Sequence, residues 1–393
     1  QGAAAMGVDW NEISPAVFWG FLFPALGGFM FGYDIGATSH AITDDQVLLD
    51  YHAIGEPFLA GVLHGASLYG ALIMSVILFN YGDSIGRKRT MIMSSALYFM
   101  GSLFSAMVPG EEKLGLTFLV LSRMVYGCGI GSAMHSVPVY IAEMAPPSVR
   151  GFLISLKEAV IVFGMFMGYV VGGAFMSQAH GWRYMYGMGC VGALVYGGGV
   201  YYLPDSPRWL LLKNLKSPYQ YPRDLARDAL VWFRGDLEGT AIDEEIAHIV
   251  DSLQAKNVEP ELVGLAPTRQ AENTPLVSSL DEGDNTDWAA LFKSRRALVI
   301  GNGLLLFQQI TGQPSVLYYA VTIFRSANFG KSSAAFASLG VAFVKLITTL
   351  YVGFKVDQYG RRMLLTIGIS GMGLALSLIA LSFQYGFTST VDT

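Results

Sequence analysis

Two charged residues fall inside long apolar stretches of the sequence, where ionised side chains are rare. Asp34 lies deep in the stretch 16–37, and Arg123 lies in the stretch 115–140. An unpaired charge at membrane depth costs at least about 2.5 kcal/mol, so such residues pair or face a watery cavity. Low dielectric favours a neutral carboxyl group and a nearby guanidinium favours its charged form, so a small movement can switch its protonation. The two residues therefore indicate either a proton switch or a static structural ion pair.

Nine apolar stretches would position these side chains. A hydrocarbon core about 30 Å thick requires about 20 apolar residues per helix. The sequence is 52% hydrophobic and 14% charged, with a mean hydropathy of +0.43, which is typical of a chain that has a bilayer as its solvent. We therefore expect an all-α polytopic membrane protein. The predicted spans are 16–37, 57–80, 90–109, 115–140, 152–177, 183–203, 297–324, 332–356 and 363–387.

A charged segment of about ninety residues, 204–296, separates the sixth predicted span from the seventh. We interpret it as a cytosolic linker with short amphipathic helices at about 222–234 and 241–255. It would divide the chain into an N-terminal six-helix bundle, 1–203, and the first three helices of a second bundle, 297–393. Lys and Arg cluster on the linker side of the spans and acids on the other, which puts the N-terminus and the linker in the cytosol or its topological equivalent. The deciding residues are Arg87, Lys88, Arg89, Arg150, Arg361 and Arg362 on one side, and Asp44, Asp45, Asp50 and Glu56 on the other.

Several classes of function are disfavoured by the composition. The net charge of −5 argues against a nucleic-acid partner, which requires a basic face. Cys128 and Cys190 have neither disulfide nor metal-ligand spacing, which leaves a disulfide framework and a metal site unsupported. We also expect no cofactor. No phosphate-binding GxxxxGK[ST] occurs, which leaves ATP-driven pumping unsupported. His64 and His135 lie within spans without a partner at ligand spacing, and we interpret them as packing residues rather than ligands or proton relays.

A short motif occurs twice, at equivalent places. Asp-Ser-Ile-Gly-Arg-Lys at 83–88 follows the second span, and Asp-Gln-Tyr-Gly-Arg-Arg at 357–362 follows the second span after the linker. This D-x-x-G-R-[KR] repeat is typical of a duplicated six-helix unit. Three further helices are then expected beyond the C-terminal end. The glycines at 164, 168 and 172 have a spacing that permits close approach between helices.

Seven segments together resemble the sugar-porter family of the major facilitator superfamily. They are GGFMFGYDIGA (27–37), GDSIGRKR (82–89), SRMVYGCGIG (122–131), PVYIAEMAPPSVRG (138–151), LPDSPRWL (203–210), QQITGQPSVLYYA (308–320) and DQYGRR (357–362). Within the family, SLKE, GWRYMYG and LFQQITGQPSVLYYA are most similar to the plant and algal D-xylose-proton symporter-like group. The resemblance implies two six-helix bundles, here truncated to about nine transmembrane helices, with a sugar bound between them and alternating access.

The resemblance also assigns roles to residues. It implies that Asp34 and Arg123 form the proton site of a sugar:proton symporter and that Gln308 and Gln309 bind the sugar. Neutral polyols need fixed donors and acceptors beside apolar surface, although amides can also hold helices together. Two tyrosines, Tyr318 and Tyr319, match a pair near the extracellular gate. Gln313 adds a third amide on the same stretch, without a role in the family.

Three positions depart from the commoner sugar-porter pocket. Glu158 replaces a Gln of the fifth span, Pro314 an Asn of the seventh and Lys345 an Asn of the eighth. We hypothesise that Glu158 and Lys345, one from each half, form an ion pair across the pocket, so that neither charge is unpaired in a low-dielectric site. The alternative is that the Lys345 side chain extends to a membrane interface.

A further set of charges matches the cytosolic latch of the family, which holds the two halves together in the outward-facing state. Such pairs bias a two-state equilibrium and do not bind substrate. Topology-setting charge is the alternative, but it explains the basic residues and not the spaced acids. The set is Asp83, Arg87, Glu143, Arg150, Asp205, Arg208, Asp357, Arg361 and Arg362.

The main interpretation is therefore a secondary active transporter of a hexose or pentose, and not an enzyme. Its partners are a small sugar, a proton and the lipid bilayer. A passive sugar or polyol facilitator and a non-transporting membrane sugar receptor are the rival interpretations. The first residue is Gln1 and not Met, so any signal or transit peptide would be missing from this sequence, and the sequence alone does not name the membrane. The resemblance suggests the plastid envelope or the vacuolar membrane, with the plasma membrane as a third candidate.

Overall fold

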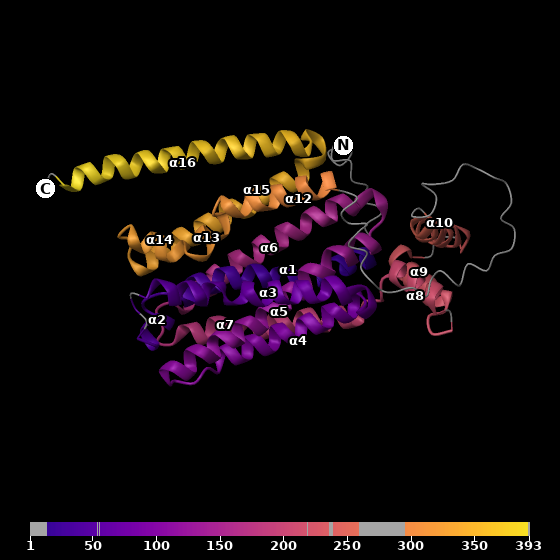
Figure 1. Cartoon of the computed structure of the whole chain (residues 1–393), viewed down its shortest axis with the longest axis horizontal. Helices are drawn as coiled ribbons and strands as arrows, with labels where there is room; N and C mark the ends of the chain where they lie inside the picture. The colour runs from indigo at the N-terminus through magenta and orange to yellow at the C-terminus, as the bar shows by residue number, and fades with distance from the viewer. Residues whose placement is uncertain are drawn as a thin grey trace.

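The computed structural model describes residues 14–391, apart from 53, 55, 218, 236–238 and 259–294. Every regular element in these described ranges is a helix, so the predicted all-α class is confirmed. Figure 1 shows a bundle of long helices that run roughly along one axis. The first six long helices are α1 (Pro15–Ala41), α3 (Pro57–Ile85), α4 (Arg87–Ala106), α5 (Glu112–Met144), α6 (Pro147–Phe175) and α7 (Gly181–Tyr202).

These six helices pack into one bundle. The extensive contacts are between α1 and α6, between α3 and α5, and between α4 and both α5 and α7. Apolar side chains such as Met30, Tyr98 and Tyr196 fill the space between them. Local sequence fixes where the first helix starts: the Ser14 hydroxyl accepts a hydrogen bond of 3.2 Å from the Val17 amide, and Pro15 follows it directly. A short helix, α2 (Val47–Asp50), closes one end of the bundle, here named the α2 end.

Three further helices lie at the opposite end of the bundle, here named the linker end (Figure 1). They are α8 (Pro207–Lys216), α9 (Arg223–Arg234) and α10 (Gly239–Val258). Their apolar faces share a separate small core that includes Trp209, Leu230 and Ile242. Helices were predicted at 222–234 and 241–255 from the amphipathic pattern, and α9 and α10 confirm both.

The predicted single span at 297–324 is divided into three helices. They are α12 (Arg295–Ile310), α13 (Gln313–Tyr318) and α14 (Ala320–Ser326). The first break lies at Gly312, whose φ of +74° is a left-handed conformation that glycine adopts without strain. Pro314, in the first turn of α13, has no amide hydrogen to continue the preceding helix. Discontinuous helices of this kind line binding sites in many membrane transporters.

The remaining helices are α15 (Lys331–Tyr359) and α16 (Arg361–Val391). Helix α15 packs along α6, and α16 runs beside α15 on the outside (Figure 1). Five described helices are long and apolar enough to cross a membrane, namely α1, α3, α5, α6 and α15. The other four predicted spans coincide with α4, α7, α12–α14 and α16, so the count of nine spans stays a prediction. The division at 203 and 296 into two bundles and a linker also stays a prediction.

Candidate functional site

Asp34 and Arg123 form an ion pair in the centre of the bundle. The guanidinium Nη2 of Arg123 on α5 contacts Oδ1 of Asp34 on α1. The two residues are 1–2% exposed, so water does not screen the pair. Removing one partner of a buried pair leaves an uncompensated charge, which costs about 3–5 kcal/mol. The contact expected from two charges in separate apolar stretches is thus present.

Hydroxyl groups complete the surroundings of this pair. Ser67 on α3 donates a hydrogen bond of 2.9 Å to Oδ2 of Asp34. The Thr38 hydroxyl accepts a hydrogen bond of 3.1 Å from Nη2 of Arg123, and it lies one turn after Asp34 on α1. The Arg123 guanidinium also lies over the rings of Tyr126 and Tyr186, 5.1 Å and 4.6 Å from their centroids. The charges are therefore held by four helices, and a relative movement of these helices would change the balance between them.

Sequence reasoning missed Ser67, Thr38 and Tyr186. The sequence could have indicated Thr38, because it follows Asp34 by four residues and residues four apart lie on one face of a helix. Nothing in the local pattern around Ser67 or Tyr186 indicates that these residues meet Asp34 and Arg123. Their helices come together only through tertiary packing.

The two consecutive tyrosines of the broken helix meet the bundle beside this pair. Tyr318 is buried, and its hydroxyl lies close enough for the charges of Asp34 and Arg123 to act on it. The Tyr319 ring stacks on the His64 ring of α3, with centroids 4.2 Å apart and planes inclined by 24°. Nearby, the Tyr169 hydroxyl on α6 donates a hydrogen bond of 2.7 Å to the Leu317 carbonyl. The broken helix is thus fixed to the bundle at the α2 end.

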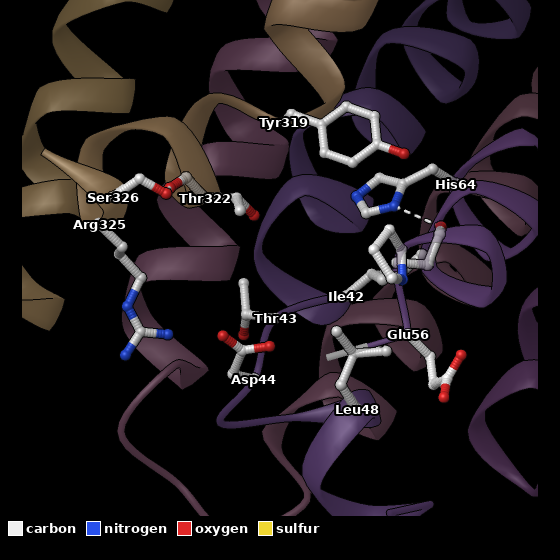
Figure 2. A pocket seen from close by; sticks show the side chains of 12 residues that line it. Ile42, Thr43, Asp44, Leu48, Glu56, His64, Tyr319, Thr322, Arg325 and Ser326 are labelled. Carbon is white, nitrogen blue, oxygen red and sulfur yellow. Dashed lines mark hydrogen bonds between the residues drawn. The ribbon is translucent and has the colours of Figure 1, made fainter. Parts of the chain in front are cut away.

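A pocket of about 650 Å³ opens at the α2 end, between α1, α3 and α14. Figure 2 shows His64 and Tyr319 at one side of it and Arg325 across from them. Two exposed carboxylates, Asp44 and Glu56, also line the pocket. Just outside, Asp45 forms ion pairs with Arg325 and with Lys331, the second at 3.3 Å. This charged cluster joins the α1–α2 loop to α14 and to the start of α15.

The predicted amides lie on the other side of the helix break. Gln308 and Gln309 are exposed in the last turn of α12, directly before Gly312. They do not line the pocket at the α2 end. The Gln313 side chain lies outside the described residues. Gln308 and Gln309 thus lie on α12 and the tyrosines Tyr318 and Tyr319 follow the break at Gly312, and the sugar-binding role of all these residues stays a prediction.

The predicted ion pair between Glu158 and Lys345 is not formed in this structure. Oε1 of Glu158 lies 2.8 Å from Nζ of the neighbouring Lys157. Lys345 on α15 is partly buried and near enough for the charge of Glu158 to act on it. Glu158 thus has two basic neighbours, and in this structure Lys157 holds its carboxylate.

Several residues of the predicted latch meet at the linker end. Nη1 of Arg87 lies 2.7 Å from Oδ1 of Asp83, and Nη2 lies 3.1 Å from Oε1 of Glu143. The Ser206 hydroxyl donates a hydrogen bond of 2.6 Å to Oε2 of Glu143. The Asp83 carbonyl accepts a hydrogen bond of 2.9 Å from the Trp209 indole. These contacts tie α3, α4, α5 and α8 together.

The other latch residues are less connected. Burial raises the pKa of the Asp205 carboxyl group, and the nearby Lys88 and Arg89 lower it in part. Arg150 donates a hydrogen bond of 3.3 Å to the Ala145 carbonyl. Arg208 and Arg362 are exposed. The side chains of Asp357 and Arg361 lie outside the described residues, so a latch between the two halves stays a prediction.

Comparison with known proteins assigns the family. The family model described as sugar (and other) transporter matches residues 21–391. A relative from Arabidopsis thaliana, "D-xylose-proton symporter-like 3, chloroplastic", is 41% identical over 93% of this chain and 62% of its own length. The human "Proton myo-inositol cotransporter" is 33% identical over 98% of this chain and 54% of its own length. The chain therefore spans less than two thirds of the length of either relative.

The solved structures agree with this assignment. The proton:xylose symporter XylE bound to 6-bromo-6-deoxy-D-glucose has a TM-score of 0.68 and 25% identity, over 88% of this chain and 70% of that one. It is described as a member of the major facilitator superfamily. These relatives are transporters and not enzymes. Because the family model covers nearly the whole chain, this protein belongs to the sugar (and other) transporter family of integral membrane proteins, with the helical fold of the major facilitator superfamily.

Proposed function

We propose that this chain carries the proton site and part of the sugar site of a monosaccharide:proton symporter that works by alternating access. The observation that carries the proposal is the buried contact between Asp34 and Arg123. A passive carrier of a neutral sugar does not need an ion pair at this depth, where desolvation is costly. Proton binding to Asp34 would release Arg123 and change which arrangement of the helices is favoured.

Gln308 and Gln309 are the proposed sugar ligands. Their amides can both donate and accept hydrogen bonds, as a polyol requires. They precede the break at Gly312, so movement of α13 and α14 would change their surroundings relative to the bundle. Replacing Gln308 with Ala should raise the KM for sugar, while the sugar-independent proton conductance stays at the wild-type level.

The test is uptake of labelled glucose and xylose by the full-length protein in proteoliposomes, with and without an imposed pH gradient. Wild type should accumulate sugar against its gradient when the outside is acidic. Asp34→Asn should lose this accumulation and retain exchange of sugar across the membrane, which also shows that the variant is folded. If the wild-type protein takes up sugar at the same rate with and without the pH gradient, the protein is a facilitator. Failure of the purified protein to transport any sugar would favour a receptor.

A polyol is the second candidate substrate. The observation that favours it is the 33% identity to the human relative named as a proton myo-inositol cotransporter. The departures at Glu158, Pro314 and Lys345 also leave the commoner hexose pocket incomplete. Competition experiments separate the two substrates. Unlabelled myo-inositol and unlabelled glucose are each added during uptake of labelled xylose, and the polyol is favoured if myo-inositol abolishes xylose uptake at a lower concentration than glucose does.

We propose the plastid envelope as the membrane. The Arabidopsis relative that is 41% identical carries "chloroplastic" in its name. The vacuolar membrane and the plasma membrane are the alternatives. A fluorescent protein fused to the C-terminus of the full-length chain would show the location, and fluorescence at the vacuolar or plasma membrane would contradict this proposal.

A further inference from the structure

His64 lies between the Asp34–Arg123 pair and the pocket at the α2 end. It is 4% exposed, and its side chain is part of the pocket lining. The charges of Asp34 and Arg123 both act on its ring. An ionisable group that is buried between an open pocket and an internal ion pair is in a position to exchange a proton with both.

The hydrogen bonding of the ring fixes its tautomer. Nδ1 lies 2.8 Å from the Ala60 carbonyl, a contact drawn as the dashed line in Figure 2. A carbonyl oxygen only accepts, so Nδ1 of the neutral ring carries the hydrogen and Nε2 has the free lone pair. Nε2 lies near the Tyr318 main chain and makes no hydrogen bond of normal geometry within the described part of the chain.

Tyr319 holds this ring in place from the other half of the protein. The two rings are stacked, with their centroids 4.2 Å apart (Figure 2). Tyr319 lies at the junction of α13 and α14, whereas His64 belongs to α3. Movement of the broken helix away from the bundle would therefore uncover the imidazole to the pocket.

Hydroxyl groups connect the neighbourhood of His64 to Asp34. Ser67 lies three residues after His64, on the same face of α3. Its hydroxyl donates the 2.9 Å hydrogen bond to Oδ2 of Asp34. The buried Tyr318 hydroxyl lies close to Ser67 and to Asp34, without a hydrogen bond of normal geometry to either. The two hydroxyl groups beside Asp34 thus belong to residues that neighbour His64, Ser67 on the same helix and Tyr318 through its main chain.

We propose that His64 is the relay through which a proton from the pocket reaches Asp34. A hydronium ion in the pocket gives a proton to Nε2 and is left as water, and the imidazolium then releases this proton to the hydroxyl groups of Tyr318 and Ser67. Ser67 passes its own hydrogen to Oδ2 of Asp34 and takes one in return. One proton leaves the pocket and one arrives at Asp34, while His64 and both hydroxyl groups are restored. This proposal rests on the proposed proton coupling and adds the route by which the proton reaches Asp34.

The other charges that face His64 fit this direction. On the pocket side these are the carboxylates of Asp44 and Glu56 and the guanidinium of Arg325. Asp45 neutralises Arg325 through their ion pair, so the two pocket carboxylates attract protons to this entrance. On the inner side the charges of Asp34 and Arg123 oppose each other. Protonated Asp34 would leave the positive charge of Arg123 to repel a second proton from His64.

His40 supplies a matched control within the same chain. It is buried on α1, its Nδ1 lies 3.1 Å from the Gly36 carbonyl, and its Nε2 makes no hydrogen bond with the described residues. Its ring packs edge-on against Tyr169. His40 does not line the pocket at the α2 end. The two histidines share burial and tautomer, and only His64 lies between the pocket and Asp34.

The test measures sugar-driven proton influx with a pH dye inside proteoliposomes that hold the full-length protein. We compare wild type, His64→Gln and His40→Gln from pH 5 to pH 8, and normalise the influx to sugar counterflow, which reports folded protein. His64→Gln should slow the influx about ten-fold or more and flatten its pH profile. His40→Gln should keep the wild-type profile after the same normalisation, even if it lowers the yield of protein.

Two outcomes overturn the relay in different ways. If wild type shows no sugar-driven proton influx, the proposed coupling itself fails and the relay fails with it. If wild type is coupled and His64→Gln has the wild-type rate and pH profile, only the relay fails. Should His64→Gln show no counterflow, His64→Ala is measured with added imidazole, which can occupy the space next to Tyr319. Restored proton influx supports the relay, and influx that imidazole leaves unchanged contradicts it.

Discussion

Ser67 on α3 donates a hydrogen bond of 2.9 Å to Oδ2 of Asp34 on α1, in a region where both side chains are almost completely buried. This contact joins two helices directly at the charge that the proposed mechanism uses. Oδ1 of the same carboxylate contacts Arg123, so the two oxygens have different partners. Asp34 is therefore held from α3 and α5 at once.

Replacing Ser67 with Ala should destabilise the protein through this carboxylate. Hydrogen bonds to charged groups contribute about 1.5–3 kcal/mol, compared with about 0.5–1.5 kcal/mol for neutral ones. Ser132→Ala is the control, because the Ser132 hydroxyl is also buried and, within the described part of the chain, donates its hydrogen bond of 2.8 Å to the Cys128 carbonyl of its own helix. Thermal unfolding in detergent should show a larger loss for Ser67→Ala than for Ser132→Ala. Equal losses would mean that the Asp34 contact adds nothing.

A second prediction concerns the close packing of α1 on α6. A Cβ atom added at Gly168 would lie 2.4 Å from the Tyr33 carbonyl oxygen, which belongs to the backbone and cannot rotate away. Gly168→Ala should therefore push the two helices apart and cost about 1–3 kcal/mol. Gly173 is the control on the same helix, since its added Cβ would lie 3.6 Å from Ala335 Cβ, an ordinary contact.

The expected readout is the midpoint of thermal unfolding together with the yield of folded protein. Gly168→Ala should lower both. Gly173→Ala should leave the midpoint unchanged or raise it slightly, because Ala favours the helix over Gly by about 1 kcal/mol. If the two variants behave alike, the approach of α1 and α6 at Gly168 is looser than in this structure.

The sequence allowed much of this arrangement to be predicted, for identifiable reasons. The helix positions followed from the length of the apolar stretches, and the meeting of Asp34 with Arg123 followed from the cost of leaving either charge alone in an apolar setting. The glycine spacing in α6 indicated a close helix contact, and Gly168 makes one with α1. These features depend on strong local sequence patterns or on one large term, the free-energy cost of an unpaired charge in an apolar setting.

Other features could not be predicted in this way. The break between α12 and α13 was missed although Gly312 and Pro314 are turn signals, because the apolar run was given more weight. The contact of Glu158 with Lys157 was not predicted, and adjacent residues on a helix normally do not face each other. His64 was interpreted as a packing residue, since its position beside the pocket depends on α14, which is far away in the sequence.

A third prediction concerns pH and the Asp205 carboxyl group at the linker end. Burial raises its pKa above the ordinary value of 3.8, and the attraction of Lys88 and Arg89 offsets this only in part. A raised pKa in the folded state means that the neutral acid favours folding. This contribution is complete below the ordinary pKa and is lost as the pH rises through the folded pKa.

Asp205→Asn should therefore be more stable than wild type near pH 7, and the difference should shrink as the pH falls towards 4. Unfolding midpoints in detergent between pH 4 and pH 8 test this. Asp224→Asn, on the exposed first turn of α9, is a surface control that should change little across this range. A less stable Asp205→Asn at neutral pH would show that the attraction of Lys88 and Arg89 outweighs the cost of burial.

The last prediction separates the two basic neighbours of Glu158. In this structure its carboxylate lies 2.8 Å from Nζ of Lys157, while Lys345 acts on it from α15. If Lys345 becomes the partner during the transport cycle, Glu158→Gln should reduce sugar uptake more than the double variant Glu158→Gln/Lys345→Asn does. The reason is that the single change leaves the partly buried Lys345 without a compensating charge, and the double change removes both.

The parallel variant Glu158→Gln/Lys157→Met serves as the control for this cycle. Uptake rates of wild type, the three single variants and the two double variants are measured at equal amounts of folded protein. Rescue by Lys345→Asn alone assigns the functional pair to Glu158 and Lys345, across the two halves of the protein. Rescue by Lys157→Met alone assigns it to the contact seen here, within α6. In each double variant, the loss of uptake rate could instead equal the sum of the losses in its two single variants. That result in both double variants would contradict any pairing of Glu158 in transport.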